Sequence, residues 1–113
     1  MQHNRKLCIS TAGSRKAVHW QKNEVLWSEF VERLKTPIRG TETQEQYLAM
    51  TKAQQAELKD VGGFVGGTLT GDRRKAGCVE GRDLVTLDLD SIPAGQTDDI
   101  LRRVDGLGCA AAV

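Results

Sequence analysis

Apolar side chains recur at helical spacing among polar ones between residues 23 and 35. Four of them fall at positions i, i+3, i+4 and i+7: Trp27, Phe30, Val31 and Leu34. This spacing places them on one face of an amphipathic helix. Asn23 is the expected N-cap, and Pro37 cannot continue a helix, so we predict a helix at about 23–35.

A second stretch, at about residues 43–60, is also predicted to be helical. It carries two capping boxes, in which a threonine is followed three residues later by a glutamine; the pairs are Thr43 with Gln46 and Thr51 with Gln54. Two boxes in one stretch indicate one or two short helices. Gly62 is the expected end, because glycine readily adopts the left-handed conformation that closes many helices.

Short runs of β-forming residues predict the strands. We expect strands at about 6–10, 63–69, 83–90 and 108–113, a polar connection over 11–23, and a loop or hairpin over 70–82. Between the last two strands, Thr97 is the expected N-cap of a helix and Gly106 follows its last turn. Residues 83–113 therefore predict a strand–helix–strand unit with a right-handed crossover.

These elements predict an α/β or α+β fold in a single domain, residues 1–113, because 113 residues suffice for one compact domain. The last predicted strand has only begun at Val113. We therefore expect the truncated amino-terminal part of a larger catalytic domain.

Composition narrows the function classes. The net charge is only +1, so the sequence lacks the overall basic field of many nucleic-acid-binding proteins. No run of 18 apolar residues is present, which predicts no membrane span, and the first residues lack the apolar core of a signal peptide. The three cysteines, Cys8, Cys78 and Cys109, are scattered, which indicates reduced thiols and a cytoplasmic protein.

The main chemical candidate is the stretch LVTLDLD, residues 84–90, which carries Asp88 and Asp90 two positions apart. On a strand, these two carboxylates and Thr86 share one face. Two neighbouring carboxylates repel when both are ionised, and a divalent cation removes the conflict; Mg²⁺ prefers such ligands together with water and substrate phosphates. The alternative is that Asp88 lies at a solvated strand end and Asp90 opens a turn.

Two groups of basic residues are candidates for binding nucleotide or nucleic-acid phosphates. Arg73, Arg74 and Lys75 form a basic turn, and Arg15 and Lys16 follow the first predicted strand. The simpler interpretation of the turn is a solvated hairpin tip. The phosphate-binding loop motif GxxxxGK[ST] is absent from the sequence.

Several stretches resemble a known family. They are RKLCISTAGSRKAVHW, LWSEFVERL, KDVGGFVGGTL, GRDLVTLDLDSIPAG and RRVDGLGCA. They look like the amino-terminal part of primase-like proteins of phages and integrated elements, often labelled virulence-associated protein E. That part is similar to the archaeo-eukaryotic primase, or prim-pol, fold.

The resemblance implies a metal-dependent DNA primase-polymerase that takes part in replication of a mobile element. Asp88 and Asp90 would be its catalytic, metal-binding residues, with Mg²⁺ or Mn²⁺ as cofactor. Nucleoside triphosphates, a DNA template and a helicase-like ATPase region would be its partners. The family's small residue–histidine motif and third acidic residue lie beyond Val113, and Ala111 stands where an aromatic residue is expected. The resemblance therefore predicts nucleotidyl transfer by the full-length protein and an inactive 113-residue chain.

Two alternatives remain. The chain could be a non-catalytic truncated remnant that binds nucleic acid or a partner. The stretch LVTLDLDSI also resembles the haloacid dehalogenase signature hhhDxDx[TV], in which the first aspartate is a phosphoryl acceptor, but Ile92 replaces the usual Thr or Val.

Overall fold

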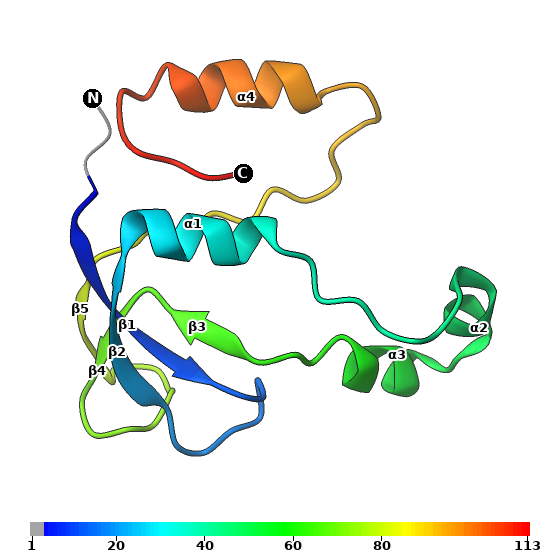
Figure 1. The fold of residues 1–113 in the computed structure, drawn as a ribbon, viewed down its shortest axis with the longest axis horizontal. Helices are drawn as coiled ribbons and strands as arrows, with labels where there is room; N and C mark the ends of the chain where they lie inside the picture. The colour runs from blue at the N-terminus through cyan, green and yellow to red at the C-terminus, as the bar shows by residue number, and fades with distance from the viewer. Residues whose placement is uncertain (1–3) are drawn as a thin grey trace.

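The structure is a computed structural model and describes residues 4–113. It confirms an α+β fold, in which short antiparallel strands and helices follow one another along the chain (Figure 1). The elements are β1 (Lys6–Ala12), β2 (Gln21–Leu26), α1 (Trp27–Lys35), α2 (Gln44–Ala49), α3 (Lys52–Leu58), β3 (Gly63–Val65), β4 (Gly67–Leu69), β5 (Val79–Arg82) and α4 (Thr97–Asp105).

The central strand is β1, which pairs antiparallel with both β2 and β3. The pairing with β2 runs from Lys6 opposite Leu26 to Thr11 opposite Gln21. The shorter β3 covers only the second half of β1, from Ser10 to Ala12. The strand predicted at 6–10 is thus confirmed, whereas the connection predicted over 11–23 contains the start of β2.

Of the two alternatives predicted for residues 70–82, a loop or a hairpin, the structure shows a hairpin. Strands β4 and β5 pair antiparallel, and the register shifts between Thr68 and Leu69. Glycine is required at Gly67, because a Cβ there would lie 1.8 Å from the carbonyl oxygen of Gly81. The predicted strand 63–69 is therefore split between two sheets, which are joined where the hydroxyl of Ser10 donates a hydrogen bond to the carbonyl of Gly67 (2.9 Å).

The core lies where α1 packs against the central sheet. Leu7 and Ile9 of β1 and Phe30 of α1 are buried, and Trp27 and Phe64 pack against them. The rings of Phe30 and Phe64 meet edge to face with centroids 4.9 Å apart, a favourable aromatic geometry. The apolar face predicted for this helix is confirmed in its first turns.

The predicted start of α1 was wrong. The helix begins at Trp27 with Leu26 as its N-cap, and Asn23 belongs to β2. The reason is non-local: Asn23 lies opposite Ile9 in the sheet, and its side-chain amide donates a hydrogen bond to the hydroxyl of Thr11 (2.5 Å). Pairing with β1 outweighs the local capping preference of asparagine.

The helical stretch predicted at 43–60 consists of two helices, α2 and α3. Both predicted capping boxes are present, with Thr43 and Thr51 as the N-caps. The prediction of the end was imprecise, because α3 ends at Leu58 with Lys59 as its C-cap. Gly62 instead adopts a positive φ of 98° just before β3 begins.

The strand–helix–strand unit predicted at 83–113 is wrong in its two strands. Only α4 forms, with Gln96 rather than Thr97 as its N-cap, and residues 84–90 and 108–113 belong to no strand. The amides of Asp83 and Leu84 both donate to the carbonyl of Gly66, which ends the β4–β5 ladder. A strand needs a neighbour for its backbone groups, and no described segment supplies one beyond this point.

The fold is open. Helices α2 and α3 form an arm that extends away from the sheets, and α4 lies on the other side of α1 (Figure 1). The radius of gyration is 16.5 Å, against about 13 Å for a compact domain of 100 residues. The accessible surface is 9148 Å², against roughly 6100 Å² expected for a compact monomer of 12.4 kDa. Within residues 4–113, no helix is long and apolar enough to span a bilayer.

Candidate functional site

Asp88 and Asp90 lie in the exposed segment that follows β5. Oδ1 of Asp90 accepts a hydrogen bond from the backbone N–H of Ser91 (2.7 Å), and Ser91 has a positive φ of 55°. The carboxylate of Asp88 makes no hydrogen bond or ion pair with another described residue. The argument that both side chains share one face depended on a strand, and this segment has no strand.

The two carboxylates fit a divalent cation only in part. Both are exposed and no basic side chain of the described part of the chain neutralises them, so their oxygens are accessible to a cation. Among residues 4–113, however, no three acidic, histidine or cysteine side chains gather as a metal-binding group. Water and substrate phosphates would have to supply the remaining ligands, as they commonly do for Mg²⁺. The metal site therefore stays a prediction.

Arg73, Arg74 and Lys75 lie in the connection between β4 and β5, as the hairpin interpretation predicts. The guanidinium of Arg74 lies over the ring of buried Trp20, 5.0 Å from its centroid. Nδ1 of His19, the residue before Trp20, lies 2.5 Å from a carboxylate oxygen of Asp72. The turn is thus packed against the β1–β2 connection.

The structure does not bring this basic turn next to the two aspartates. The turn precedes β5, and Asp88 and Asp90 follow it, so they extend from opposite ends of the same strand (Figure 1). A joint site that holds one triphosphate between the turn and the aspartates is not present in this arrangement.

Arg15 and Lys16 lie in the β1–β2 connection, beside the end of α3. The backbone N–H of Arg15 donates to Oδ1 of Asp60 (2.8 Å), and Lys16 forms an ion pair with Glu57. The hydroxyl of Ser14 donates to Oδ2 of Asp60 (2.5 Å). The pKa of Asp60 lies below its ordinary value. The largest cause is the hydrogen bond from the Ser14 hydroxyl to the charged carboxylate, and the hydrogen bond from the Arg15 N–H adds to it.

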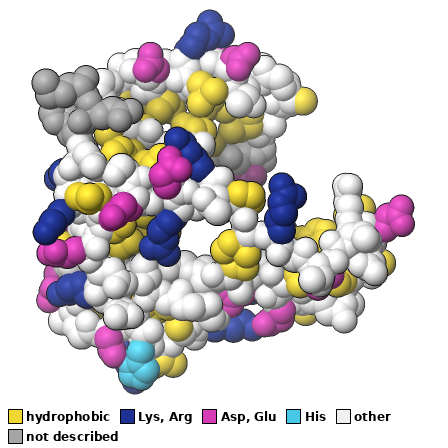
Figure 2. All heavy atoms as spheres, in the orientation of Figure 1, with side chains coloured by type: hydrophobic (Ala, Val, Ile, Leu, Met, Phe, Trp, Pro, Cys, Tyr) yellow, Lys and Arg dark blue, Asp and Glu magenta, His cyan; other side chains and the backbone are white. Residues whose placement is uncertain are grey.

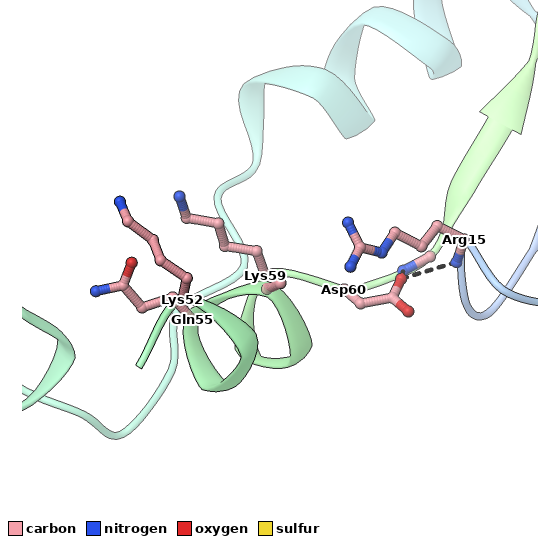
Figure 3. A pocket seen from close by; sticks show the side chains of 7 residues that line it. Arg15, Lys52, Gln55, Lys59 and Asp60 are labelled. Atoms are coloured by element: carbon pink, nitrogen blue, oxygen red, sulfur yellow. Dashed lines mark hydrogen bonds between the residues drawn. The ribbon is translucent and has the colours of Figure 1, made fainter. Parts of the chain in front are cut away.

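Sequence reasoning missed two basic residues that lie close to Arg15. Lys52 and Lys59 of the α3 region line a cavity together with Arg15, Gln55 and Asp60 (Figure 3). Their signal was present in the sequence, since residues seven apart lie on one face of a helix. What the sequence could not show is that the β1–β2 connection reaches this face.

Asp83 follows β5 directly, and its side chain has a structural role. Its Oδ2 accepts the backbone N–H of Cys8 (2.7 Å), and its carbonyl accepts a hydrogen bond from Arg5 (3.0 Å). Since β3 covers only the second half of β1, the carboxylate takes the place of a strand beside Cys8. Asp83 thereby joins the end of β5 to the centre of the fold.

Fold and site together define a small α+β domain with two exposed carboxylates and a separate basic cavity. All of residues 1–113 match the family model described as VapE N-terminal domain, and the chain belongs to this family. The match confirms the resemblance to VapE-type proteins of phages and mobile elements. It includes residues 84–92, the stretch that resembles the haloacid dehalogenase signature. No curated protein and no solved structure matches the chain.

Proposed function

We propose that this chain is the amino-terminal part of a metal-dependent primase-polymerase of a mobile element. Membership of the VapE N-terminal domain family supports the mobile-element context. The observation that carries the catalytic part is the pair of exposed carboxylates, Asp88 and Asp90, which no basic side chain of the described residues neutralises.

In this proposal, Asp88 and Asp90 hold Mg²⁺ or Mn²⁺ together with the phosphates of a nucleoside triphosphate. Nucleotidyl transfer joins the 3′ oxygen of a growing strand to the α-phosphorus and expels pyrophosphate. A cation held by carboxylates stabilises the negative charge on the transferring group. The DNA template, a helicase-like ATPase region and a cytoplasmic location are parts of the same proposal.

Isothermal titration calorimetry with Mn²⁺ tests the metal site. The wild-type chain is compared with Asp88→Asn/Asp90→Asn, which keeps side-chain size and removes both charges. Asp98→Asn/Asp99→Asn is the matched control, because it removes two charges from the first turn of α4. We expect the binding heat to disappear in the first variant and to persist in the control. Identical isotherms for wild type and Asp88→Asn/Asp90→Asn would contradict the metal assignment.

A second candidate function is nucleic-acid binding without catalysis. It is favoured by the position of Arg73–Lys75 at the opposite end of β5 from the two aspartates. Oligonucleotide binding that persists in the absence of divalent cations, combined with no Mn²⁺ binding by the wild type, would favour this function over the first.

A further inference from the structure

We propose that Arg15, Lys52 and Lys59 form a binding site for the phosphate groups of a nucleic-acid strand or a nucleoside triphosphate. These residues line a cavity of about 350 Å³ where the arm joins the sheet. This volume lies at the lower end of the range for small-ligand sites. The inference deepens the proposed function and rests on it for the source of the phosphate, but it concerns residues distant in sequence from Asp88 and Asp90.

The two sides of the cavity are fixed to each other. Asp60 accepts hydrogen bonds from the Ser14 hydroxyl, the Arg15 N–H and, at 3.4 Å, the Gly62 N–H. The ion pair of Lys16 with Glu57 adds a second connection between the β1–β2 loop and α3. The cavity is therefore preorganised, which reduces the entropy that a ligand must lose on binding.

The charges of the cavity favour an anion. Within residues 4–113, the side chains of Arg15, Lys52 and Lys59 form no ion pair, and Nζ of Lys59 lies 5.3 Å from the centroid of the Tyr47 ring. The single acidic residue of the lining is Asp60, and donors from Ser14 and the backbone already occupy both of its oxygens. Three cations thus line the cavity with one carboxylate, whose charge attracts Arg15, and the lining keeps a net positive charge.

The arrangement of the cations favours phosphate groups over a single carboxylate. Lys52 and Lys59 extend from the same side of α3, and the guanidinium of Arg15 projects beside them (Figure 3). Seven residues correspond to roughly 10 Å along a helix axis, so the two lysine side chains start about two turns apart. A chain of phosphates can contact all three side chains, and the arginine fork matches phosphate oxygens.

Fluorescence anisotropy with a short labelled oligothymidylate in EDTA tests this site without any role for a metal. Lys52→Gln/Lys59→Gln is compared with Lys22→Gln/Lys35→Gln, a control that removes the same charge from exposed lysines on β2 and α1. We expect the first variant to lose about tenfold or more in affinity, from two charge-assisted contacts, and the control to lose far less. The slope of log affinity against log salt should fall by roughly 0.7 for each lost phosphate contact.

A parallel titration with fluorescent ATP identifies the source of the phosphate. A selective loss of oligothymidylate binding assigns the site to a strand backbone, and a selective loss of ATP binding assigns it to the triphosphate. Equal affinities of Lys52→Gln/Lys59→Gln and its control for both probes would overturn the inference. Failure of the metal proposal would appear separately, as identical Mn²⁺ isotherms, because that experiment leaves both lysines intact.

Discussion

Two regions of this chain differ in how their apolar residues are used. Between residues 5 and 84, apolar side chains of β1, α1 and β3 pack into one core around Leu7, Ile9 and Phe30. Between residues 85 and 113, no apolar side chain is buried: Ile100 and Val104 are half-buried, and Val85 and Leu87 keep 80% and 79% of their surface accessible. Figure 2 shows such side chains open to solvent around α4 in the upper part of the view.

The contrast shows what an apolar pattern can and cannot specify. A helix satisfies its backbone hydrogen bonds locally, so α4 forms where the sequence predicts it even though none of its residues is buried. A strand depends on a neighbour from elsewhere in the chain. The alternation of Val85, Leu87 and Leu89 with polar residues indicates a strand as clearly as the stretch at 6–10 does, but only the latter finds partners.

The largest expected effect comes from making the same substitution in both regions. Leu7→Ala removes a side chain that is 1% exposed, and we expect it to lower the free energy of unfolding by about 2–5 kcal/mol. Leu87→Ala should change the free energy by no more than about 0.5 kcal/mol, because its side chain is 79% exposed. Urea unfolding followed by circular dichroism measures both.

Comparable losses for the two leucine variants would remove the distinction between the regions. They would show that residues 84–90 are buried in solution. A dependence of the Leu87→Ala effect on protein concentration would then identify a second copy of the chain as what covers them.

The next effect concerns the boundary between the regions. Asp83→Ala leaves the backbone N–H of Cys8 without its acceptor, and we expect a loss of about 1–3 kcal/mol in the free energy of unfolding. Asp88→Ala is the matched control five residues further on, where the carboxylate bonds to no described residue, and it should be nearly neutral. Equal effects would show that the packed region does not end at Asp83.

The predictability of the fold follows the same division. The sequence predicts the features that depend on residues close in sequence. These are the capping boxes at Thr43 and Thr51, the apolar face of the helix that begins at Trp27, and the hairpin at 70–82. Three features depend instead on partners distant in sequence: the position of Asn23 in a strand, the division of residues 63–69 between two sheets and the absence of the strand predicted at 83–90. In the candidate sites, the residue types were predictable, but the proximity of Arg15 to Lys52 and Lys59 required the β1–β2 connection to meet α3.

The smallest expected effect tests a contact within the packed region, at the base of the arm. Because the Ser14 hydroxyl and the Arg15 N–H lower the pKa of Asp60, the carboxylate stabilises the fold above its ordinary pKa of 3.8. This contribution decreases as the pH falls from about that value through the lower pKa of the folded state. Asp60→Asn should therefore have a lower melting temperature than wild type at neutral pH, and the difference should shrink below about pH 4.

Ser14→Ala sharpens this last test, because it removes the main cause of the lowered pKa and keeps the backbone N–H donor of Arg15. In this variant the pKa of Asp60 should lie closer to the ordinary value. Its acid loss of stability should therefore begin at the same pH as in wild type, end at a higher pH and be smaller overall. Melting temperatures of the three chains across the acid range provide the measurement. If the difference between wild type and Asp60→Asn stayed constant down to the acid limit, the charge of the carboxylate would not contribute to stability. The arm would then be attached through Lys16 and Glu57, whose exposed ion pair contributes about 0–1 kcal/mol.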